Sequence, residues 1–395
     1  MNGSTAEHVA VPLASRLDGF PGYPLADVPQ IRRELRARGV DVIDLGAGDA
    51  ELSPPPAALA ALREASNDPA MSRYPFQLGL PEYREAVAAW MQTRFGVRVD
   101  AYREILPLIG SKEGIAHLAL CYVNAGDATV LPDPGYQPYV GGTLLAGGQP
   151  FAVPLTADNG FLIDVDAIPA AIVRRTRILY LNYPNNPTAA IAPREYLEHV
   201  VAFCRRHAIM LAYDNAYSEI AFDGYSPPSI LEIDGAIDVA VEFHSFSKTY
   251  NMTGWRIGWA AGGAEAIAAL SRVKSFIDTG QFLGVQAAAR AALGVWAEWV
   301  PGNVAEFAAR RDSLVAELQN TGFEATSPKA TMYVWFPIPP GTDSHAFARR
   351  ALLEEGVVIM PGAALGPGGE GWLRAALTQP ADRLAEAARR LATLL

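Results

Sequence analysis

The stretch "EILPLIGSKEGIAHLALCYV", residues 104–123, contains the pattern that decides the fold. Its first part, up to Gly110, is an almost continuous apolar run, which is typical of a short strand buried on both faces. The rest places apolar side chains at helical spacing, so we expect a helix to follow the strand directly. Repeated strand–helix pairs build a parallel or mixed sheet that helices cover on both faces.

The same alternation continues as far as residue 248. Further strands are predicted within residues 127–135, 177–187, 208–217 and 236–248, and a helix is predicted over 193–207. Polar residues stand where these strands end, namely Ser111, Tyr136, Asn186, Asp214 and Lys248. Because sheets of this class bind ligands beyond the carboxyl ends of their strands, the pattern predicts a binding site there.

The C-terminal part of the chain has a different pattern. Residues 283–320 are predicted to be mainly helical, and after them strands at 331–338 and 371–377 alternate with helices at 343–356 and 381–395. This order indicates a smaller α+β domain. The 395-residue length alone suggests about two domains.

Composition limits the classes of function. Half of the residues are hydrophobic and the net charge is −10, which argues against a disordered chain and against nucleic acid or anionic membranes as partners. Cys121 and Cys204 lie in apolar runs and are predicted to be buried thiols. The first twenty residues have no apolar core of a signal peptide and no run is long enough for a membrane span, so we expect a cytoplasmic protein.

Several cofactor motifs are missing from the sequence. There is no HExxH, paired CxxC, GxxxxGK[ST] or GxSxG, and the six histidines show no ligand spacing, so no metal is expected. "GPGGEG" at 366–371 matches a dinucleotide-binding pattern by letters, but no helical run follows it, and we predict a turn.

The stretch "EFHSFSKTYNMTGWRIGWAAGG", residues 242–263, places Lys248 and Arg256 in apolar surroundings. A lysine in such surroundings has its charged form disfavoured, so its amine can act as a nucleophile. Arg256, Ser245 and Ser247 suit a phosphate group. Together these residues fit a carbonyl cofactor that carries a phosphate, which describes pyridoxal phosphate.

Pyridoxal phosphate also needs an acidic partner for its pyridine nitrogen. Asp214, directly after an apolar strand, is the candidate, and Tyr217 one helical turn later can donate to the phenolic oxygen. Each residue has a plain structural alternative: Asp214 is a common type of helix cap, and most lysines are surface residues. The functional interpretation depends on the whole set occurring together.

Several segments, which follow one another in the same order along the chain, resemble those of the class I/II aminotransferases of fold type I, which use pyridoxal phosphate. The segments that carry the resemblance are "DLGAGD", "RYPFQLGLPEYREAVAAW", "IGSKEGIAH", "LPDPGYQPY", "NYPNNPTA", "YDNAY", "SFSKTYNMTGWRIGW" and "GWLRAAL". The resemblance implies an α/β fold with a mostly parallel, seven-stranded type of sheet between helices. It also implies an N-terminal segment (1–45) packed with the small domain, a large cofactor domain (46–290) and a small C-terminal domain (291–395).

The resemblance assigns roles around the cofactor. Lys248 forms the internal aldimine and later moves the substrate proton, Asp214 pairs with the pyridine nitrogen, and Tyr136 stacks on the ring. Asn186 and Tyr217 bind the phenolic oxygen. The residues implied to hold the phosphate are Ser111, Lys112, Ser245 and Arg256, joined by Tyr74 from the other subunit of a homodimer.

On the substrate side, the resemblance implies that Arg374 binds the α-carboxylate, and that Asn186, Gly46 and Tyr23 also line the substrate site. The implied reaction is transamination between an L-amino acid and a 2-oxo acid, with 2-oxoglutarate as the expected acceptor.

Within the family the sequence is most similar to LL-diaminopimelate aminotransferases, but it departs from them at pocket positions. Phe76, Gln77 and Leu78 stand near the place where that group carries an acidic residue, and Leu365 and Gly368 replace aromatic residues. These departures leave the cofactor assignment intact and weaken the assignment of the substrate. A lyase, cyclase or oxidase on the same scaffold remains an alternative, as does a cofactor-binding regulatory domain without activity.

Overall fold

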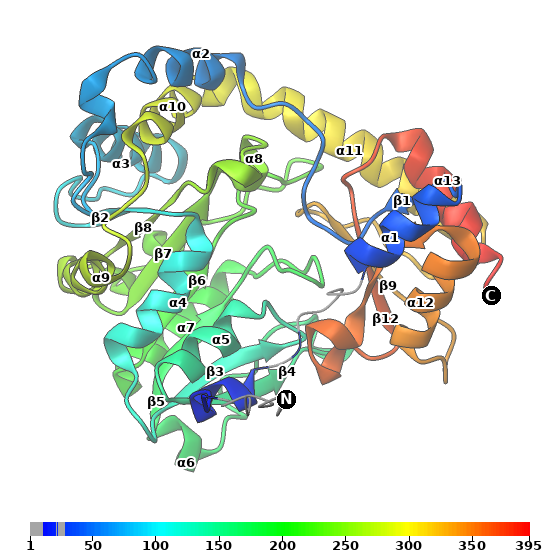
Figure 1. Ribbon diagram of the computed structural model, residues 1–395. Helices are drawn as coiled ribbons and strands as arrows, with labels where there is room; N and C mark the ends of the chain where they lie inside the picture. The colour runs from blue at the N-terminus through cyan, green and yellow to red at the C-terminus, as the bar shows by residue number, and fades with distance from the viewer. Residues whose placement is uncertain (1–10, 21, 23–27) are drawn as a thin grey trace, which may run out of the picture.

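A central sheet of seven strands organises the larger part of the molecule (Figure 1). The computed structural model describes residues 11–20, 22 and 28–395. The strand order is β2-β8-β7-β6-β5-β3-β4, and β8 runs antiparallel to both of its neighbours while the others run parallel to one another. The strands are β2 (Ile105–Leu108), β3 (Ala128–Asp133), β4 (Gln149–Pro154), β5 (Thr176–Leu181), β6 (Met210–Asp214), β7 (Ala240–Ser245) and β8 (Gly258–Gly262). The predicted α/β class with a mostly parallel seven-stranded sheet is therefore confirmed.

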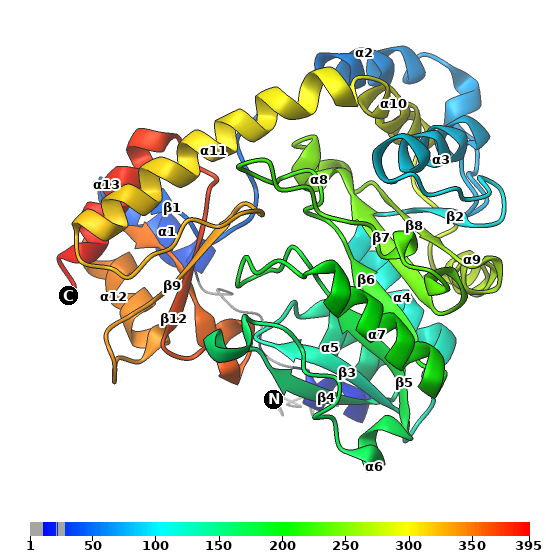
Figure 2. The same ribbon diagram turned by 180° about the vertical axis from the view of Figure 1, so that it is seen from behind.

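Helices cover both faces of this sheet, as the two opposite views show (Figures 1 and 2). On one face, Ile115 and Leu118 of α4 pack against Phe243 of β7 within one apolar cluster. On the other, Leu197 and Val200 of α7 belong to a second cluster. The helices of this part are α2 (Pro56–Ala65), α3 (Pro81–Phe95), α4 (Ser111–Tyr122), α5 (Pro138–Leu145), α6 (Ala170–Val173), α7 (Arg194–His207), α8 (Phe246–Thr249), α9 (Ala264–Ile277) and α10 (Leu283–Gly294). Burial on both faces explains why the strands are apolar throughout rather than alternating.

The smaller part contains a three-stranded antiparallel sheet in the order β11-β12-β9, together with the pair β1-β10. The 25-residue helix α11 runs from beside α10 to this smaller part (Figure 2). The remaining elements are α1 (Val28–Ala37), β1 (Ile43–Asp44), α11 (Trp296–Asn320), β9 (Tyr333–Pro337), α12 (Ser344–Glu355), β10 (Val357–Val358), β11 (Met360–Pro361), β12 (Trp372–Ala376) and α13 (Ala381–Ala392). The N-terminal strand β1 pairs in parallel with β10. The exact domain boundaries, 1–45, 46–290 and 291–395, stay a prediction.

Two strands of the large sheet are absent from the sequence-based prediction. β4 contains two prolines and exposes most of its residues, so it lacks the apolar run that marks a buried strand. β8 lies within the lysine stretch and is rich in glycine and alanine, which have low strand propensity. Only its pairing between β2 and β7 makes it a central strand.

The described helices were compared with the length and apolarity that a membrane span requires, and none of them meets both criteria.

Candidate active site

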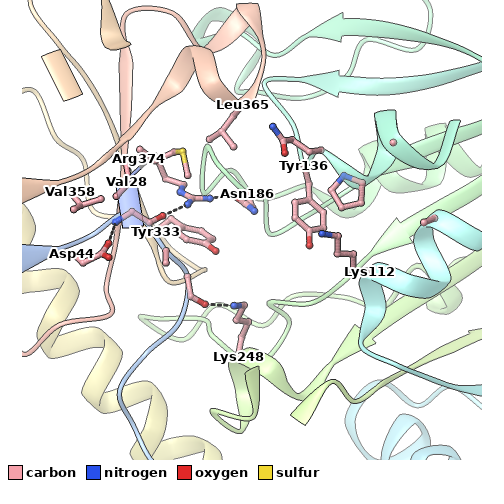
Figure 3. A pocket seen from close by; sticks show the side chains of 18 of the residues that line it. Val28, Asp44, Lys112, Tyr136, Asn186, Lys248, Tyr333, Val358, Leu365 and Arg374 are labelled. Carbon is pink, nitrogen blue, oxygen red and sulfur yellow. Dashed lines mark hydrogen bonds between the residues drawn. The ribbon is translucent and has the colours of Figure 1, made fainter. Parts of the chain in front are cut away.

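One cavity of about 700 Å³ lies between the carboxyl ends of the large sheet and the smaller part of the molecule (Figure 3). Segments far apart in sequence form its wall. Gly46 comes from the segment after β1, Asn186 and Lys248 follow β5 and β7, and Tyr333 and Arg374 come from β9 and β12. Of the five polar residues noted at strand ends, Tyr136, Asn186 and Lys248 line the cavity, whereas Ser111 and Asp214 are not among its described wall residues. The smaller part supplies the opposite wall.

Lys248 projects into this cavity from the short helix α8. The Ser245 side chain caps that helix by accepting a hydrogen bond of 3.2 Å from the Ser247 amide. The Lys248 amine is half-buried and donates to the carbonyl oxygen of Gly48. A primary amine held at the floor of a cavity by a backbone acceptor is suited to react with a carbonyl carbon.

Asp214 ends β6 and is 5% exposed. Its Oδ2 accepts a hydrogen bond of 2.9 Å from the Tyr139 hydroxyl, but its Oδ1 is buried without a hydrogen-bond partner among the described residues. Burial raises the pKa of this carboxyl to about 6, even though the hydrogen bond from Tyr139 favours the ionised form. A buried carboxylate that lacks a cation is costly, so the position fits a ligand that brings a positive charge, such as a protonated pyridine nitrogen.

Arg374 is 5% exposed and has a fixed orientation. Its Nη1 donates to Asn186 Oδ1 (2.8 Å) and its Nη2 donates to the Gly46 carbonyl (2.7 Å), while its guanidinium carbon lies 4.2 Å from the centre of the Tyr333 ring. Its Nε is buried and has no hydrogen-bond partner in the described part of the chain. A buried arginine with a spare donor beside a cavity is suited to bind a carboxylate.

A cup for an anion lies where α4 begins. Gly110 has a φ of 71°, and a Cβ on it would come within 2.6 Å of Arg256 Nη2. On the other side, a Cβ on Gly258 would lie 3.1 Å from the Ser111 amide nitrogen. The glycines thus let the arginine and the first amides of a 12-residue helix approach one another, which is the arrangement that binds phosphate groups.

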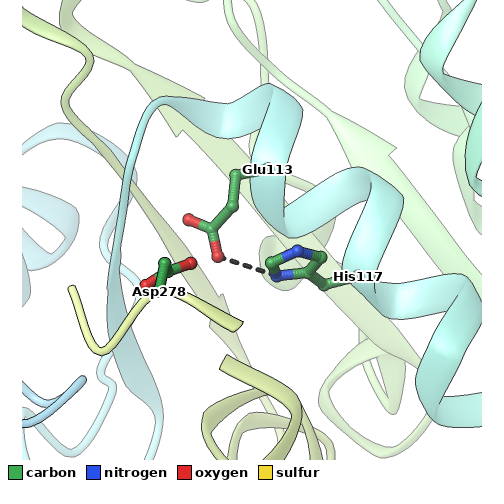
Figure 4. A group of neighbouring side chains, drawn as sticks. All are labelled: Glu113, His117 and Asp278. Atoms are coloured by element: carbon green, nitrogen blue, oxygen red, sulfur yellow. Dashed lines mark ion pairs between the residues drawn. The ribbon is translucent and has the colours of Figure 1, made fainter. Parts of the chain in front are cut away.

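A group of ionisable side chains lies at the start of α4, and Figure 4 shows three of them, Glu113, His117 and Asp278. Glu113 Oε2 accepts from the Ile109 amide (2.7 Å) and from Lys274 Nζ (3.0 Å), and Lys274 also donates to Asp278 (2.7 Å). His117 Nδ1 lies 2.9 Å from Glu113 Oε1. Glu113, His117 and Asp278 lie close enough together to hold a metal ion. Because the Lys274 ammonium already contacts both carboxylates, we interpret the group as a structural ion network.

The other predicted site residues take varied positions. Tyr136, Lys112 and Tyr217 line the cavity, with Lys112 beside Tyr136 (Figure 3). Tyr74 is 74% exposed and is not among the described residues of the cavity wall. Tyr23 lies outside the residues that the structure describes.

His244, which precedes Lys248 by four positions, is buried and is not among the described residues of the cavity wall. Its ring stacks on Trp259 at 4.6 Å and its Nε2 lies 2.8 Å from Glu242 Oε1. Burial raises the pKa of Glu242, but His244 outweighs burial and leaves that pKa below its ordinary value. His244 therefore contacts a buried carboxylate and stacks on Trp259, and it does not line the cavity among the described residues.

Sequence reasoning missed three groups of the site, namely Tyr333, Tyr139 and the carbonyl of Gly48. Tyr333 stands in a segment predicted only as a strand, and Tyr139 follows the quoted Tyr136 by three positions. A single strand or helix pattern does not show which face meets a cavity formed by distant segments. For Tyr333 the sequence offers only a weak signal, namely that its hydroxyl is a polar group inside the apolar run "TMYVWFPI".

Comparisons with known proteins agree with this site. Residues 40–391 match the family described as aminotransferase class I and II. The chain is 51% identical over 378 residues to LL-diaminopimelate aminotransferase of Desulforudis audaxviator, covering 96% of each chain. Among solved structures, substrate-bound BacF from Bacillus subtilis is similar with a TM-score of 0.93 and 34% identity, covering 98% of each chain. A probable N-succinyldiaminopimelate aminotransferase from Thermus thermophilus gives a TM-score of 0.89 and 39% identity, covering 93% of this chain and 99% of the other.

These matches cover nearly the whole chain, and the residues around the cavity fit the cofactor that the family uses: a reactive amine, an unpaired buried carboxylate and a phosphate cup. The chain belongs to the class I and II aminotransferase family, and it is an aminotransferase that depends on pyridoxal phosphate.

Proposed function

We propose that this aminotransferase moves the amino group of an L-amino acid to 2-oxoglutarate, and that its donor carries a second polar group far from the α-carbon. The observation that carries the proposal is the extent of the cavity. Lys248 and Arg374 line one part of it, and an ion pair between Arg32 and Asp44 lines another. The cofactor and the donor would share this cavity of about 700 Å³, and a small amino acid held by Arg374 would not reach that pair.

Each residue has a defined task in the proposed reaction. Bound pyridoxal phosphate supplies an aldehyde and an electron-accepting ring. The Lys248 amine would take up and give back the proton of the substrate α-carbon, as a general base and acid. Asp214 would pair with the ring nitrogen of the bound group, and Arg374 would hold the α-carboxylate while Asn186 and Gly46 orient its guanidinium.

The far wall of the cavity supports a donor with a second head group. Arg32 Nη1 donates to Asp44 Oδ2 at 2.5 Å, and the other guanidinium nitrogens of Arg32 have no hydrogen-bond partner among the described residues. Asp44 Oδ1 accepts from the Gly46 amide (2.9 Å), which links the pair to the turn that orients Arg374. An adjacent cation and anion complement the carboxylate and ammonium of a distal amino-acid group, which diaminopimelate has at both ends. The name of the 51% identical relative points to the same donor.

We also propose that the enzyme is a homodimer in which Tyr74 enters the active site of the other subunit. Tyr74, Phe76, Leu78, Phe276, Ile277 and Phe282 form an exposed group of apolar residues, here called the apolar patch. The two segments of the patch are joined by a hydrogen bond of 2.6 Å from the Gln77 amide to the Thr279 carbonyl. Phe276 is 87% exposed, and exposed apolar patches of this kind mark interfaces.

We place the enzyme in the cytoplasm, since its two cysteines are free thiols.

The reaction is tested by mixing the purified holoenzyme with single amino acids and recording the absorbance of the bound cofactor. We expect LL-diaminopimelate to convert the cofactor to its amine form and 2-oxoglutarate to reverse the change. A donor without a distal polar group, such as alanine, should react much more slowly. Release of ammonia or of a cyclic product without an acceptor would overturn the transaminase assignment, and equal rates for both donors would overturn the proposed substrate class.

A further inference from the structure

Tyr333 stands between the reacting amine and the carboxylate-binding arginine. We propose that it is a positioning residue for the transamination, with its hydroxyl supporting the Lys248 amine and its ring holding the Arg374 guanidinium. The inference goes beyond the residues that the sequence pattern predicts. It rests on the proposed amino transfer but not on the identity of the donor.

The hydroxyl of Tyr333 lies among the reactive groups. A Cβ on Gly48 would collide with this hydroxyl and would lie 3.4 Å from Lys248 Nζ, so both atoms border the same glycine. The Gly48 carbonyl accepts the hydrogen bond from that same amine. Tyr217, which also lines the cavity, donates to the Tyr333 hydroxyl at 3.3 Å. The support proposed for the lysine is a hydrogen bond that the Tyr333 oxygen would accept from the lysine nitrogen when that nitrogen is protonated.

The ring of Tyr333 supports the other half of the site. The Arg374 guanidinium carbon lies 4.2 Å from the ring centre, within the range of a cation–π interaction. Tyr333 is 3% exposed, so this contact is dry and stronger than one at the surface. Arg374 lines the cavity, its Nε is buried without a hydrogen-bond partner among the described residues, and the ring limits the positions that the guanidinium can take.

Four titratable or charged groups surround the Tyr333 hydroxyl: Lys248 from α8, Arg374 from β12, Tyr217 after β6 and Asp214 at its end. Burial raises the pKa of Tyr333, but the positive charges of Arg374 and Lys248 outweigh burial and leave the pKa below its ordinary value.

The test compares Tyr333→Phe, which removes only the hydroxyl, with Tyr333→Leu, which also removes the ring. In the Tyr333→Phe holoenzyme, the absorbance band of the bound cofactor should titrate at lower pH, because the protonated lysine nitrogen has lost an acceptor. Its kcat should fall about tenfold while KM for the donor changes less than about twofold, the size expected for one hydrogen bond to a charged group. Tyr333→Leu should raise KM by up to about a further tenfold, since the cation–π contact is lost.

A second readout does not depend on the cofactor. In the cofactor-free protein, ultraviolet titration of tyrosine ionisation should show an early-ionising tyrosine in the wild type that is missing from Tyr333→Phe. Tyr183→Phe is the matched control, because the hydroxyl of buried Tyr183 donates to the Phe161 carbonyl (2.9 Å) and lies outside the cavity wall. The proposal is overturned if Tyr333→Phe leaves the titration of the cofactor band and kcat as in this control, or if Tyr333→Leu leaves KM unchanged.

Discussion

At the residue scale, the site is defined by buried polar atoms that lack partners within the described part of the chain. Asp214 Oδ1 and Arg374 Nε are two such atoms, and both belong to side chains that are 5% exposed. Leaving a buried polar atom unpaired costs about 1–3 kcal/mol, so the fold without ligands is less stable than it would be with these atoms satisfied. In the proposed reaction, a positive ring nitrogen would satisfy the first of these atoms and a carboxylate the second.

Asp214→Asn should make the cofactor-free protein more stable at neutral pH. Burial raises the pKa of the folded-state carboxyl to about 6 from 3.8, so the folded state binds the proton more tightly than the unfolded state. Stability therefore falls as pH rises from about 4 to about 6 and stays lower above it, by up to about 3 kcal/mol. Thermal melts should show the largest gain for the variant above pH 6 and little gain near pH 4.

The exposed Asp158→Asn serves as the control for this change and should show no such pH-dependent gain. A gain from Asp214→Asn that is the same at pH 4 and pH 8 would contradict the assignment. In the loaded enzyme the same variant should lose kcat by roughly 10²–10³-fold, because the amide does not stabilise the protonated ring nitrogen.

Arg32→Ala tests recognition of the distal head group. KM for LL-diaminopimelate should rise about tenfold or more, the equivalent of one charged hydrogen bond, while KM for a donor without a distal carboxylate should change little. Arg33→Ala on the same helix is the control, since Arg33 is exposed and is not part of the described cavity wall. An equal rise for both donors would mean that Arg32 acts only through Asp44 and the turn at Gly46.

At the element scale, the start of α4 depends on charges contributed by α9. The Ile109 amide is held by Glu113, and Glu113 is held by Lys274, whose side chain is 1% exposed. Burial raises the pKa of Glu113, but His117 and Lys274 outweigh burial and leave that pKa lowered, so the carboxylate stays ionised. The start of α4 is thus tied to a helix more than 150 residues later in the chain, and we expect the anion cup to depend on this link.

Lys274→Met should weaken both the fold and cofactor binding. Removing one partner of a buried ion pair costs about 3–5 kcal/mol, since Glu113 and Asp278 lose their shared cation. Differential scanning calorimetry and titration with pyridoxal phosphate measure the two effects. Arg350→Ala, which breaks an exposed pair with Glu354 on α12, should cost less than about 1 kcal/mol and leave cofactor affinity unchanged. Wild-type affinity in Lys274→Met would show that the cup does not need this network.

At the scale of the whole molecule, the active site is assembled from three parts of the chain. The large part supplies Lys248 on α8, with Asp214 at the end of β6, the segment after β1 supplies Gly46 and Gly48, and the smaller part supplies Tyr333 and Arg374. Because the groups that bind substrate and those that carry out the chemistry lie on different parts, their spacing depends on how these parts pack together. The proposed dimer adds a fourth contribution, Tyr74, through the apolar patch.

Subunit mixing tests whether Tyr74 crosses to the partner. Lys248→Ala and Tyr74→Ala are each expected to be nearly inactive as homodimers. After mixing under conditions that exchange subunits, each heterodimer should contain one complete site, formed by the lysine of one subunit and the tyrosine of the other. Activity should then return to about a quarter of the wild-type value for equal, random exchange. No recovery, with exchange shown by mass labelling, would mean that Tyr74 acts in its own subunit or not at all.

A monomer-forming variant provides an independent check of the interface. Phe276→Glu places a charge in the apolar patch and should shift the protein to a monomer in sedimentation experiments. Leu353→Glu is the control, because Leu353 is an exposed apolar residue on α12, outside the patch. If both variants sediment alike, the patch is not the interface.

Local patterns in the sequence were enough to predict most strands of the large sheet and to identify the kind of cofactor that the protein binds. Apolar runs predict β2, β3, β5, β6 and β7 because strands buried on both faces need apolar side chains throughout, and polar residues at their ends predict the binding edge. Tertiary structure alone decided that β8 is a central strand, that Tyr333 and Tyr139 belong to the site, and that Lys274 supports the phosphate cup. The physical reason is that periodicity reports whether a side chain is buried, whereas a hydrogen bond or ion pair depends on which distant segment is packed against it.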